Sequence, residues 1–350
     1  SSTSSTAERE APALAATTAF RVMTPAMAAL PTHARAVVLE EPGRIAVRDL
    51  ALVEPKPADV VVDVEYTGIS TGTERLLYTG TMPFFPGLGF PLVPGYETVG
   101  RVRWAGPESG RVVGERVFLP GAYSFTEVKN LFGGAARTLV APGTRAIPVG
   151  DELEAESILL ALGATAMHAI TDGKDGASRP ALPDLVVGHG ALGRLVARIV
   201  LALGGPAPTV WEINERRMGG AEGYQVVRPE DDPRKDYRCV CEVSGALILD
   251  QLIGRLAPGG EIVLAGFYTQ PLSFQFVPAF LRGARLRVAA EWKPADMQAV
   301  RALAVAGTLS LDGLVTHRAD AGDDAAVAQA YATAFDDPDC IKMVLDWRTR

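Results

Sequence analysis

Cysteine is scarce in this sequence, which has three in 350 residues: Cys239, Cys241 and Cys340. Three cysteines cannot supply the paired framework of a disulfide-stabilised domain. Cys239 and Cys241 alternate within an apolar run, a pattern that predicts a β-strand. The cysteine content therefore indicates a protein of the reducing cytoplasm.

Long hydrophobic runs and an excess of positive charge are also missing. No stretch of about 18 consecutive apolar residues occurs, so the sequence predicts no integral membrane segment. The net charge is −7 and the pI about 5.3, and no basic stripe is present to displace phosphate counterions. These absences argue against nucleic-acid binding and favour a small ligand.

Residues 1–33 lack periodic apolar positions and are rich in Ser, Thr, Ala and Pro, a composition that predicts a flexible tail. Their apolar segment ALAATTAF is too short and too polar for the core of a secretory signal. The whole chain is 48% hydrophobic and 21% charged, as in an ordinary globular protein. Its length predicts about two domains.

Residues 34–155 are expected to form a β-rich domain. Short segments such as RAVVLE, DVVVDVEYTGIS and TVGRVRW are separated by Gly and Pro turns, which favours a barrel-like or sandwich architecture. A Pro- and Gly-rich loop over residues 78–96 carries Phe84, Phe85 and Phe90. These rings either close the core or line a broad apolar pocket. Composition alone favours core packing.

The strongest motif is PDLVVGHGALGRLVARIVL, residues 183–201. A β-branched run precedes glycines in G-x-G-x-x-G spacing and a helical pattern follows, the context of a dinucleotide-binding turn rather than of a glycine-rich turn without a ligand. Its glycines permit a tight turn, close approach of a pyrophosphate and close helix packing, and the helix start offers free N–H groups. The predicted cofactor-binding residues here are Gly188, His189, Gly190, Ala191, Leu192 and Gly193.

The next predicted strand, PTVWEIN, ends near Glu212. An acidic side chain at this place accepts hydrogen bonds from the adenosine ribose hydroxyls, which favours NAD over NADP. Arg216 and Arg217 follow and are either ligands of a ribose phosphate or charges at a solvated helix start, the interpretation we favour. Arg217, Ser244 and Gly266 complete the predicted cofactor-binding set.

Later strands such as DYRCVCEVSG and GGEIVLAGF alternate with helical stretches, which predicts a parallel doubly wound sheet. The fold class is therefore α/β with a preceding β domain.

The order of TGISTGTE, PGYETVGRV, GERVF, LLALGATAMHAI and the glycine fingerprint resembles the medium-chain dehydrogenase/reductase superfamily. The resemblance implies a GroES-like β-barrel catalytic domain over residues 34–155. It further implies a Rossmann dinucleotide-binding domain over 156–290 and a C-terminal segment, 291–350, that returns to the catalytic domain. Because medium-chain relatives form dimers or tetramers, it also implies a homo-oligomer.

Zinc alcohol dehydrogenases of that superfamily carry a Cys near Ser70, a His-Glu pair at Tyr96 and Glu97, and often a Cys near Ala161. Only Glu97 matches, and the segment after GERVF lacks the four cysteines of their structural-zinc loop. Since zinc needs about three or four protein ligands, neither zinc site is expected here.

Further phrases, including PFFPGLGFPLVPGYETVGRV, RLAPGGEIVLAGFY and RVAAEWKPADM, are similar to a branch of the superfamily that acts in bacteriochlorophyll synthesis. The similarity implies NAD-dependent oxidation of the hydroxyethyl group of a bacteriochlorophyllide-type tetrapyrrole to an acetyl group. Arg75, Lys129 and Arg137 are candidate cations for the pigment's propionate, although solvated surface charges are the ordinary alternative.

Without zinc, side chains must take the hydroxyl proton. The resemblance indicates Tyr96, Ser70, Thr71 and Glu97 as candidate catalytic groups, with His168 as a further one on a helix near the cofactor. Glu97 is equally interpretable as a structural carboxylate, Tyr96 as a ring packed against the nicotinamide, and His168 as a satisfied helix residue. A zinc-free NADPH-dependent quinone or enoyl reductase and a noncatalytic dinucleotide-binding protein stay open as alternatives.

Overall fold

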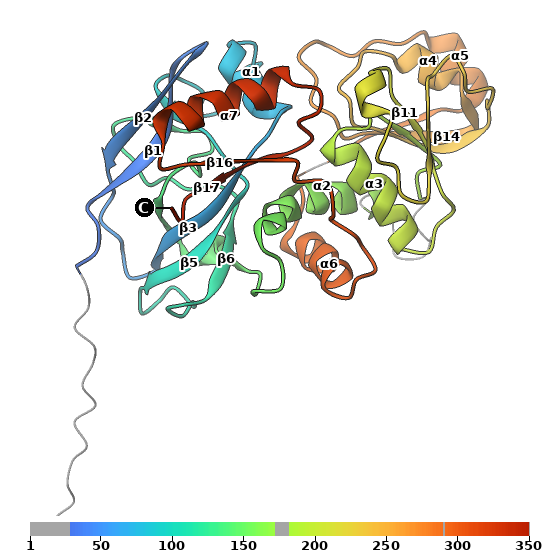
Figure 1. Ribbon diagram of the computed structural model, residues 1–350. Helices are drawn as coiled ribbons and strands as arrows, with labels where there is room; N and C mark the ends of the chain where they lie inside the picture. The colour runs from blue at the N-terminus through green and yellow to red at the C-terminus, as the bar shows by residue number, and fades with distance from the viewer. Residues whose placement is uncertain (1–28, 172–181, 290, 350) are drawn as a thin grey trace, which may run out of the picture. The chain divides into compact units, whose positions relative to one another are not determined.

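The computed structural model describes residues 29–171, 182–289 and 291–349 (Figure 1). Most of the tail predicted for residues 1–33 lies outside the described residues, and the first strand, β1, begins at His33. Contacts group Pro31–Arg350 into one compact unit.

A four-stranded sheet forms one layer of the β-rich front part. Its order is β2 (Arg44–Ala51), β1 (His33–Glu41), β4 (Leu92–Val93) and β7 (Lys129–Asn130). A small cluster of Leu39, Leu77, Met82, Leu92 and Leu131 lies between this sheet and helix α1 (Thr73–Thr79).

A seven-stranded sheet forms the second layer of the front part. Its path is β16 (His317–Asp320), β17 (Met343–Asp346), β3 (Asp59–Ile69), β5 (Thr98–Ala105), β6 (Arg116–Leu119) and β9 (Ile147–Pro148), and β8 (Thr138–Pro142) also pairs with β3. The C-terminal strand β17 runs antiparallel to the end of β3, with Met343 opposite Ile69 (Figure 1). Strands β16 and β17, from the C-terminal end of the chain, therefore belong to the same sheet as β3, from its N-terminal part.

The back part contains a six-stranded parallel sheet. Its order is β12 (Gln225–Val227), β11 (Thr209–Trp211), β10 (Leu185–Val187), β13 (Tyr237–Glu242), β14 (Leu256–Leu264) and β15 (Arg285–Val288). The chain leaves β10 toward β11 on one side and resumes with β13 on the other, so the strand order reverses between β10 and β13. Ligands of doubly wound sheets bind beyond the strand ends at such a reversal. The predicted α/β fold class is confirmed.

Alternation along these strands assigns the two faces of the parallel sheet. Val186, Cys239 and Cys241 pack with helices on one face, and Leu185 and Val240 pack on the other. The first face carries α2 (Leu160–Thr171), α3 (Ala191–Ala202) and α6 (Pro294–Val305); the second carries α4 (Leu249–Ile253) and α5 (Phe276–Arg282). Cys239 and Cys241 are buried in strand β13, and the strand predicted for them is confirmed.

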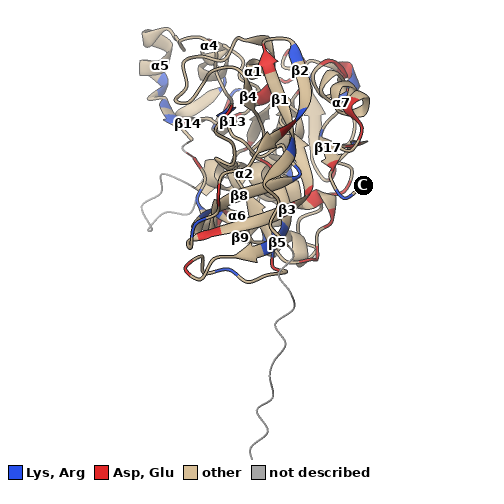
Figure 2. Ribbon diagram, turned by 90° about the vertical axis from the view of Figure 1, so that its left-hand side faces the viewer, with Lys and Arg blue, Asp and Glu red and all other residues tan. Residues whose placement is uncertain are grey.

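The remaining elements are short or peripheral. They are α7 (Asp324–Asp336), which contacts β16 and β17, and the 3₁₀ turns Gly143–Arg145, Ala155–Leu159 and Glu215–Arg217. Figure 2 shows basic and acidic residues interspersed along the ribbon rather than gathered by sign. Among the described residues, no helix has both the length and the hydropathy needed to cross a bilayer.

Candidate active site and cofactor site

Ser70 and Tyr96 meet where two strands of the front sheet end. Ser70 directly follows β3, and Tyr96 lies two residues before β5, which pairs antiparallel with β3 through Thr67 and Thr98. The Tyr96 hydroxyl donates a hydrogen bond to Ser70 Oγ at 2.6 Å. Two side chains 26 residues apart therefore form one hydrogen-bonded pair, called here the Ser70–Tyr96 pair.

The Tyr96 phenol is held in its neutral form. Burial raises its pKa well above the ordinary value, and the Glu97 carboxylate raises it further, against hydrogen bonds with Ser70 and Thr73. The ring packs edge-on against Phe132 with centroids 5.3 Å apart. A protonated phenol near neutral pH can donate a hydrogen bond to an alcohol oxygen but cannot serve as a resident phenolate base.

Glu97 forms a buried salt bridge behind this pair. Both carboxylate oxygens accept hydrogen bonds from Lys342 Nζ, at 2.9 and 2.8 Å, and both side chains are almost fully buried. A Cβ added at Gly68 would lie 2.1 Å from Glu97 Oε2, so a larger residue there would displace the carboxylate from its place beside Lys342. The contacts favour the structural interpretation of Glu97, and they involve a lysine that the sequence analysis did not select.

Glu74, in the first turn of α1, lies beside the same group. Its side chain is 1% exposed, and its Oε2 accepts a hydrogen bond from the Ser70 backbone N–H. Burial raises its pKa from 4.5 to about 8; the Ser70 hydrogen bond and Lys342 oppose this rise and Glu97 adds to it. Glu74 was missed because an acidic residue at a helix start is ordinarily an exposed cap.

Thr71 and His168 are placed differently from the Ser70–Tyr96 pair. The backbone N–H of Thr73 donates a hydrogen bond to Ser70 Oγ at 3.4 Å. Thr71 lies half-buried in the same turn. His168 Nδ1 lies 2.9 Å from Asp296 Oδ2 of α6, an ion pair if the ring is protonated. The structure thus brings Ser70, Tyr96 and Glu97 together and gives His168 a contact on another helix.

The glycine fingerprint forms the turn between β10 and α3. Gly188 has φ +105°, a value that favours glycine, and a Cβ at Gly193 would lie 1.8 Å from the Gly188 carbonyl oxygen. A Cβ at Gly190 would meet nothing within 4 Å, and no side chain caps the start of α3. Unused N–H groups and open space over Gly190 fit a dinucleotide pyrophosphate.

Glu212 lies at the end of β11, facing this turn. Its Oε2 accepts a hydrogen bond from His189 N at 3.0 Å, and its Oε1 accepts from Ile213 N and Asn214 N at 2.8 Å each. A carboxylate has about four acceptor positions, so at least one stays available for a ribose hydroxyl. The arrangement fits the role predicted for Glu212 and adds a second role, bracing the glycine turn.

Both arginines after Glu212 are engaged elsewhere. Arg216 pairs with Asp337 and Asp339, and Arg217 Nε donates to the Pro338 carbonyl at 3.0 Å. The Arg217 carbonyl accepts from His189 Nδ1 at 2.6 Å. Burial lowers the pKa of His189 to about 4, so its ring is neutral and stabilises the turn through its hydrogen bonds. The contact of His189 with Glu212 is made by its backbone N–H.

Ser244 and Gly266 lie beyond β13 and β14, next to the strand-order reversal. A Cβ at Gly188 would lie 3.1 Å from Ser244 Cβ, and one at Gly266 would lie 2.9 Å from Glu242 Oε2. Glu242, which sequence reasoning missed, is buried and accepts hydrogen bonds from Ser244 N, Gly245 N and the Tyr268 hydroxyl. It fixes the loop that faces the glycine turn.

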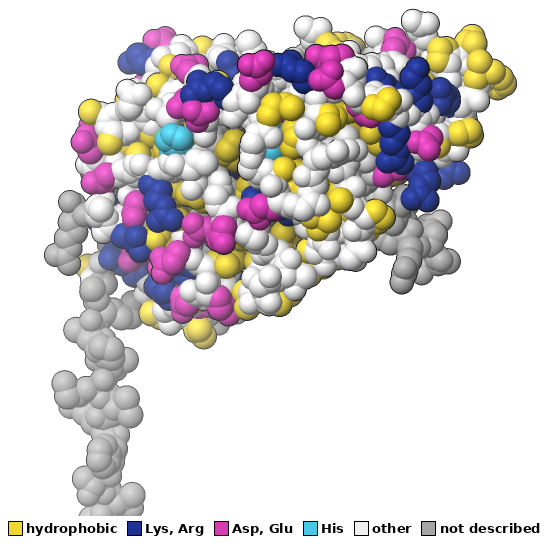
Figure 3. Space-filling view, turned by 45° about the vertical axis from the view of Figure 1, so that its right-hand side comes forward, with side chains coloured by type: hydrophobic (Ala, Val, Ile, Leu, Met, Phe, Trp, Pro, Cys, Tyr) yellow, Lys and Arg dark blue, Asp and Glu magenta, His cyan; other side chains and the backbone are white. Residues whose placement is uncertain are grey.

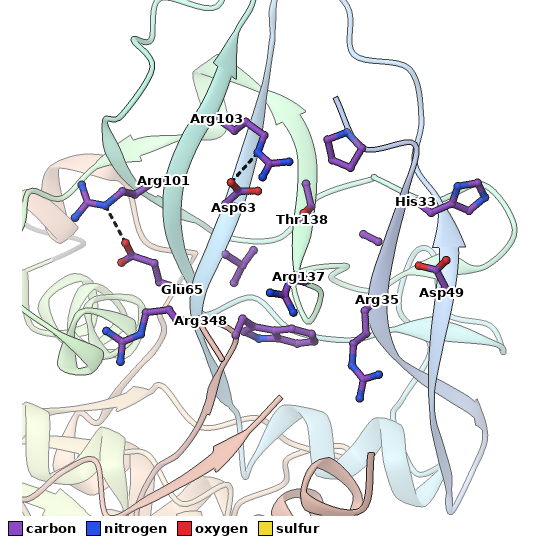
Figure 4. A pocket seen from close by; sticks show the side chains of 14 residues that line it. His33, Arg35, Asp49, Asp63, Glu65, Arg101, Arg103, Arg137, Thr138 and Arg348 are labelled. Atoms are coloured by element: carbon purple, nitrogen blue, oxygen red, sulfur yellow. Dashed lines mark hydrogen bonds and ion pairs between the residues drawn. The ribbon is translucent and has the colours of Figure 1, made fainter. Parts of the chain in front are cut away.

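A cavity of about 580 Å³ lies on a different part of the front domain. Figure 4 shows Arg35, Arg103, Arg137 and Arg348 around it, with Asp63 bonded to Arg103. Arg137, a predicted candidate for the propionate, lines this cavity, which contains none of Ser70, Glu74 and Tyr96. The cavity is therefore separate from the Ser70–Tyr96 pair.

Ser70 and Tyr96 present hydroxyl groups. Within residues 29–171, 182–289 and 291–349, no three His, Cys, Asp or Glu side chains are grouped so that they could hold a metal ion.

The β-rich front part, followed by a doubly wound sheet with a glycine-rich first turn, is the architecture expected from the resemblance to medium-chain dehydrogenases. The alcohol dehydrogenase GroES-like domain family matches residues 56–151. A 2-desacetyl-2-hydroxyethyl bacteriochlorophyllide A dehydrogenase of Rhodobacter capsulatus is 54% identical over 89% of this chain and 98% of its own length, and one of Cereibacter sphaeroides is 52% identical over the same shares. The chain therefore belongs to this family of medium-chain dehydrogenases.

Solved structures agree on the fold. The 2R,3R-butanediol dehydrogenase of Bacillus subtilis has a TM-score of 0.75 at 20% identity, covering 89% of this chain and 99% of its own. The acetophenone reductase of Geotrichum candidum, solved in complex with NAD, has a TM-score of 0.73 at 17% identity, covering 91% of this chain and 98% of its own.

Proposed function

We propose that this protein oxidises the hydroxyethyl group of 3-hydroxyethyl bacteriochlorophyllide a to the acetyl group of bacteriochlorophyllide a, with NAD and without zinc. The observation that carries the proposal is the 54% identity with an enzyme named for this pigment, over 98% of that enzyme's length. The Ser70–Tyr96 pair supplies the hydroxyl chemistry that the reaction requires.

The reaction separates a hydride and a proton. NAD supplies the hydride acceptor. The Tyr96 phenol and the Ser70 hydroxyl orient the alcohol oxygen by hydrogen bonding and provide the first step of the proton's path. The buried Glu97–Lys342 salt bridge fixes the strand ends that carry both groups. Correct orientation of the reacting atoms is itself a large part of such a rate enhancement.

Preference for NAD is supported by the surroundings of Glu212. A ribose 2′-hydroxyl can donate to its carboxylate, whereas a 2′-phosphate would meet a negative charge there. Arg216, the cation that a phosphate would need, is paired with two aspartates.

A flat, apolar pigment fits the aromatic loop before Tyr96. Phe85 packs edge-on against Phe132, with centroids 5.9 Å apart, and Phe132 packs against Tyr96. Phe85 and Phe90 are half-buried in the cluster around α1, as composition predicted, but Phe84 is 93% exposed. Phe84 therefore offers an apolar contact for a macrocycle at the edge of this ring series.

The test is to incubate the protein with hydroxyethyl bacteriochlorophyllide and either NAD or NADP, with and without a zinc chelator, while following NADH and the pigment spectrum. We expect oxidation that prefers NAD and resists the chelator. Tyr96→Phe should slow it by about 10²–10⁴-fold, the usual contribution of an acid–base group. The exposed Tyr123→Phe is the matched control.

An untouched pigment together with rapid reduction of simple quinones by NADPH would contradict the proposal. Loss of activity with removal of about one tightly bound zinc per chain would contradict its metal-free part.

A further inference from the structure

The hydrogen bond with the Ser70 backbone accounts for only one of the two oxygens of the Glu74 carboxyl. Its Oε2 accepts from Ser70 N, and its own backbone N–H donates to the Ser70 carbonyl at 3.1 Å, which closes the turn into α1. Its Oε1 is buried and has no hydrogen-bond partner among the described residues. A cap needs only one oxygen, and a buried unpaired polar atom is costly, so the second oxygen requires another explanation.

The charges around Glu74 do not balance in its ionised state. The ionisable groups that act on it are Glu97 before β5, Lys342 before β17, Tyr96, and Tyr331 on α7. Lys342 is committed to Glu97 through both carboxylate oxygens. Two buried carboxylates thus share one buried cation, and Glu74 lowers the local charge by taking up a proton.

The position of Glu74 relative to the reacting hydroxyls is equally specific. Ser70 receives the Tyr96 hydrogen bond on its side chain and donates to Glu74 from its backbone. Glu74 also acts electrostatically on the Tyr96 phenol. The Glu74 carboxyl is therefore the ionisable group that contacts the Ser70 side of the pair, through the Ser70 backbone, while Glu97 follows Tyr96 in the chain.

We propose that Glu74 receives the hydroxyl proton from the Ser70–Tyr96 pair during alcohol oxidation and returns it during ketone reduction. This inference rests on the proposed function. The carbinol C–H bond breaks and its electron pair leaves as hydride to NAD. The O–H bond breaks and its electron pair forms the C=O bond. The proton moves through the hydroxyl pair to Oε1 of the Glu74 carboxylate, the oxygen that has no hydrogen-bond partner among the described residues, and passes from there to water.

The pH dependence follows from the pKa of about 8 for Glu74. Only the carboxylate accepts a proton, so pigment oxidation at saturating substrates should rise about tenfold per pH unit below pH 8 and then level off. Ketone reduction needs the protonated form and should fall above the same pH. Measuring both directions between pH 6 and about 9.5 gives this profile.

Glu74→Gln is the decisive variant because Gln keeps an acceptor for Ser70 N and removes ionisation. We expect oxidation to fall about 10²–10⁴-fold and to lose its rise toward pH 8. Glu74→Asp should be slow but keep the rise, since it still ionises. Glu108→Gln, an exposed carboxylate at the β5–β6 turn, should match the unaltered protein.

A second readout does not depend on activity. The folded-state pKa of Glu74 is raised above its unfolded value of 4.5, so its stabilising contribution is present below about pH 4.5 and is lost as the pH rises to about 8. The melting temperature of Glu74→Gln relative to the unaltered protein should therefore increase from pH 5 to pH 8. NADH binding, monitored by fluorescence, checks that the variant is folded.

If the unaltered protein oxidises the pigment and Glu74→Gln has the same rate and the same pH profile, the inference about Glu74 is wrong. The proposed function is not affected by that result. A melting-temperature difference that is constant with pH would also overturn it. A protein that leaves the pigment untouched would instead refute the proposed function, and the melting comparison would still report whether Glu74 holds its proton.

Discussion

At the scale of single residues, the site is a set of buried polar groups that compensate one another. Lys342 binds Glu97, Tyr96 binds Ser70, and Glu74 binds the Ser70 backbone. The low dielectric of the interior strengthens each interaction and makes each unpaired group costly. Removing one member therefore has effects beyond its own contact.

The Glu97–Lys342 salt bridge provides a residue-scale prediction. Lys342→Met leaves a buried carboxylate without its cation and should lower the free energy of unfolding by about 3–5 kcal/mol. Glu97→Gln combined with Lys342→Met should cost clearly less than the sum of the single changes. Urea denaturation of the three variants measures the coupling, and strict additivity would show that the pair is not energetically linked.

At the scale of elements, the β10–α3 turn explains how a short sequence motif becomes a cofactor site. Gly188 and Gly193 are required by the turn's own geometry, whereas Gly190 faces open space. The three glycines of one motif thus serve two purposes, folding and ligand approach.

This difference is testable with Gly190→Ala. A Cβ there meets no protein atom within 4 Å, so stability should change by less than about 0.5 kcal/mol. NADH affinity should nevertheless fall at least about tenfold, or roughly 1.4 kcal/mol, because the methyl group occupies the space of the pyrophosphate. Gly254→Ala at the end of α4, where a Cβ makes ordinary contacts, is the control for equilibrium binding. An unchanged NADH affinity of Gly190→Ala would contradict a pyrophosphate site at this turn.

At the scale of the whole molecule, the far edge of the parallel sheet carries exposed hydrophobic side chains. Phe276, Val277, Phe280 and Leu281 of α5 are 62–74% exposed, and Val288 of the edge strand β15 is 73% exposed. Figure 3 shows hydrophobic side chains at the end of the molecule where α5 lies in Figure 1. An edge strand with an adjacent apolar surface is suited to pair with a second copy of itself.

We therefore expect a homo-oligomer formed through α5 and β15. Phe280→Glu should shift the protein toward the monomer in light scattering, because a charge would be buried at the contact. The equally exposed Val112→Glu, in the front domain, should leave the mass unchanged. A monomeric unaltered protein, or an oligomer indifferent to Phe280→Glu, would contradict this interface.

The sequence alone determined features that depend on neighbours along the chain. The β-alternation around Cys239 and Cys241, the glycine turn and the position of Glu212 are local patterns, because strand periodicity and turn geometry are properties of short segments. The absence of Cys and His at positions 70, 96 and 161 was equally visible.

Only the tertiary structure decided which distant residues meet. Lys342 pairs with Glu97 across 245 residues, and nothing in the segment CIKMVLDW marks its lysine as buried. Glu74 was visible in TGISTGTE, but its burial and its unpaired oxygen, as well as the effects of Glu97 and Lys342 on it, come from the tertiary structure. Burial and electrostatic coupling are set by all surrounding elements together, so no local pattern carries them.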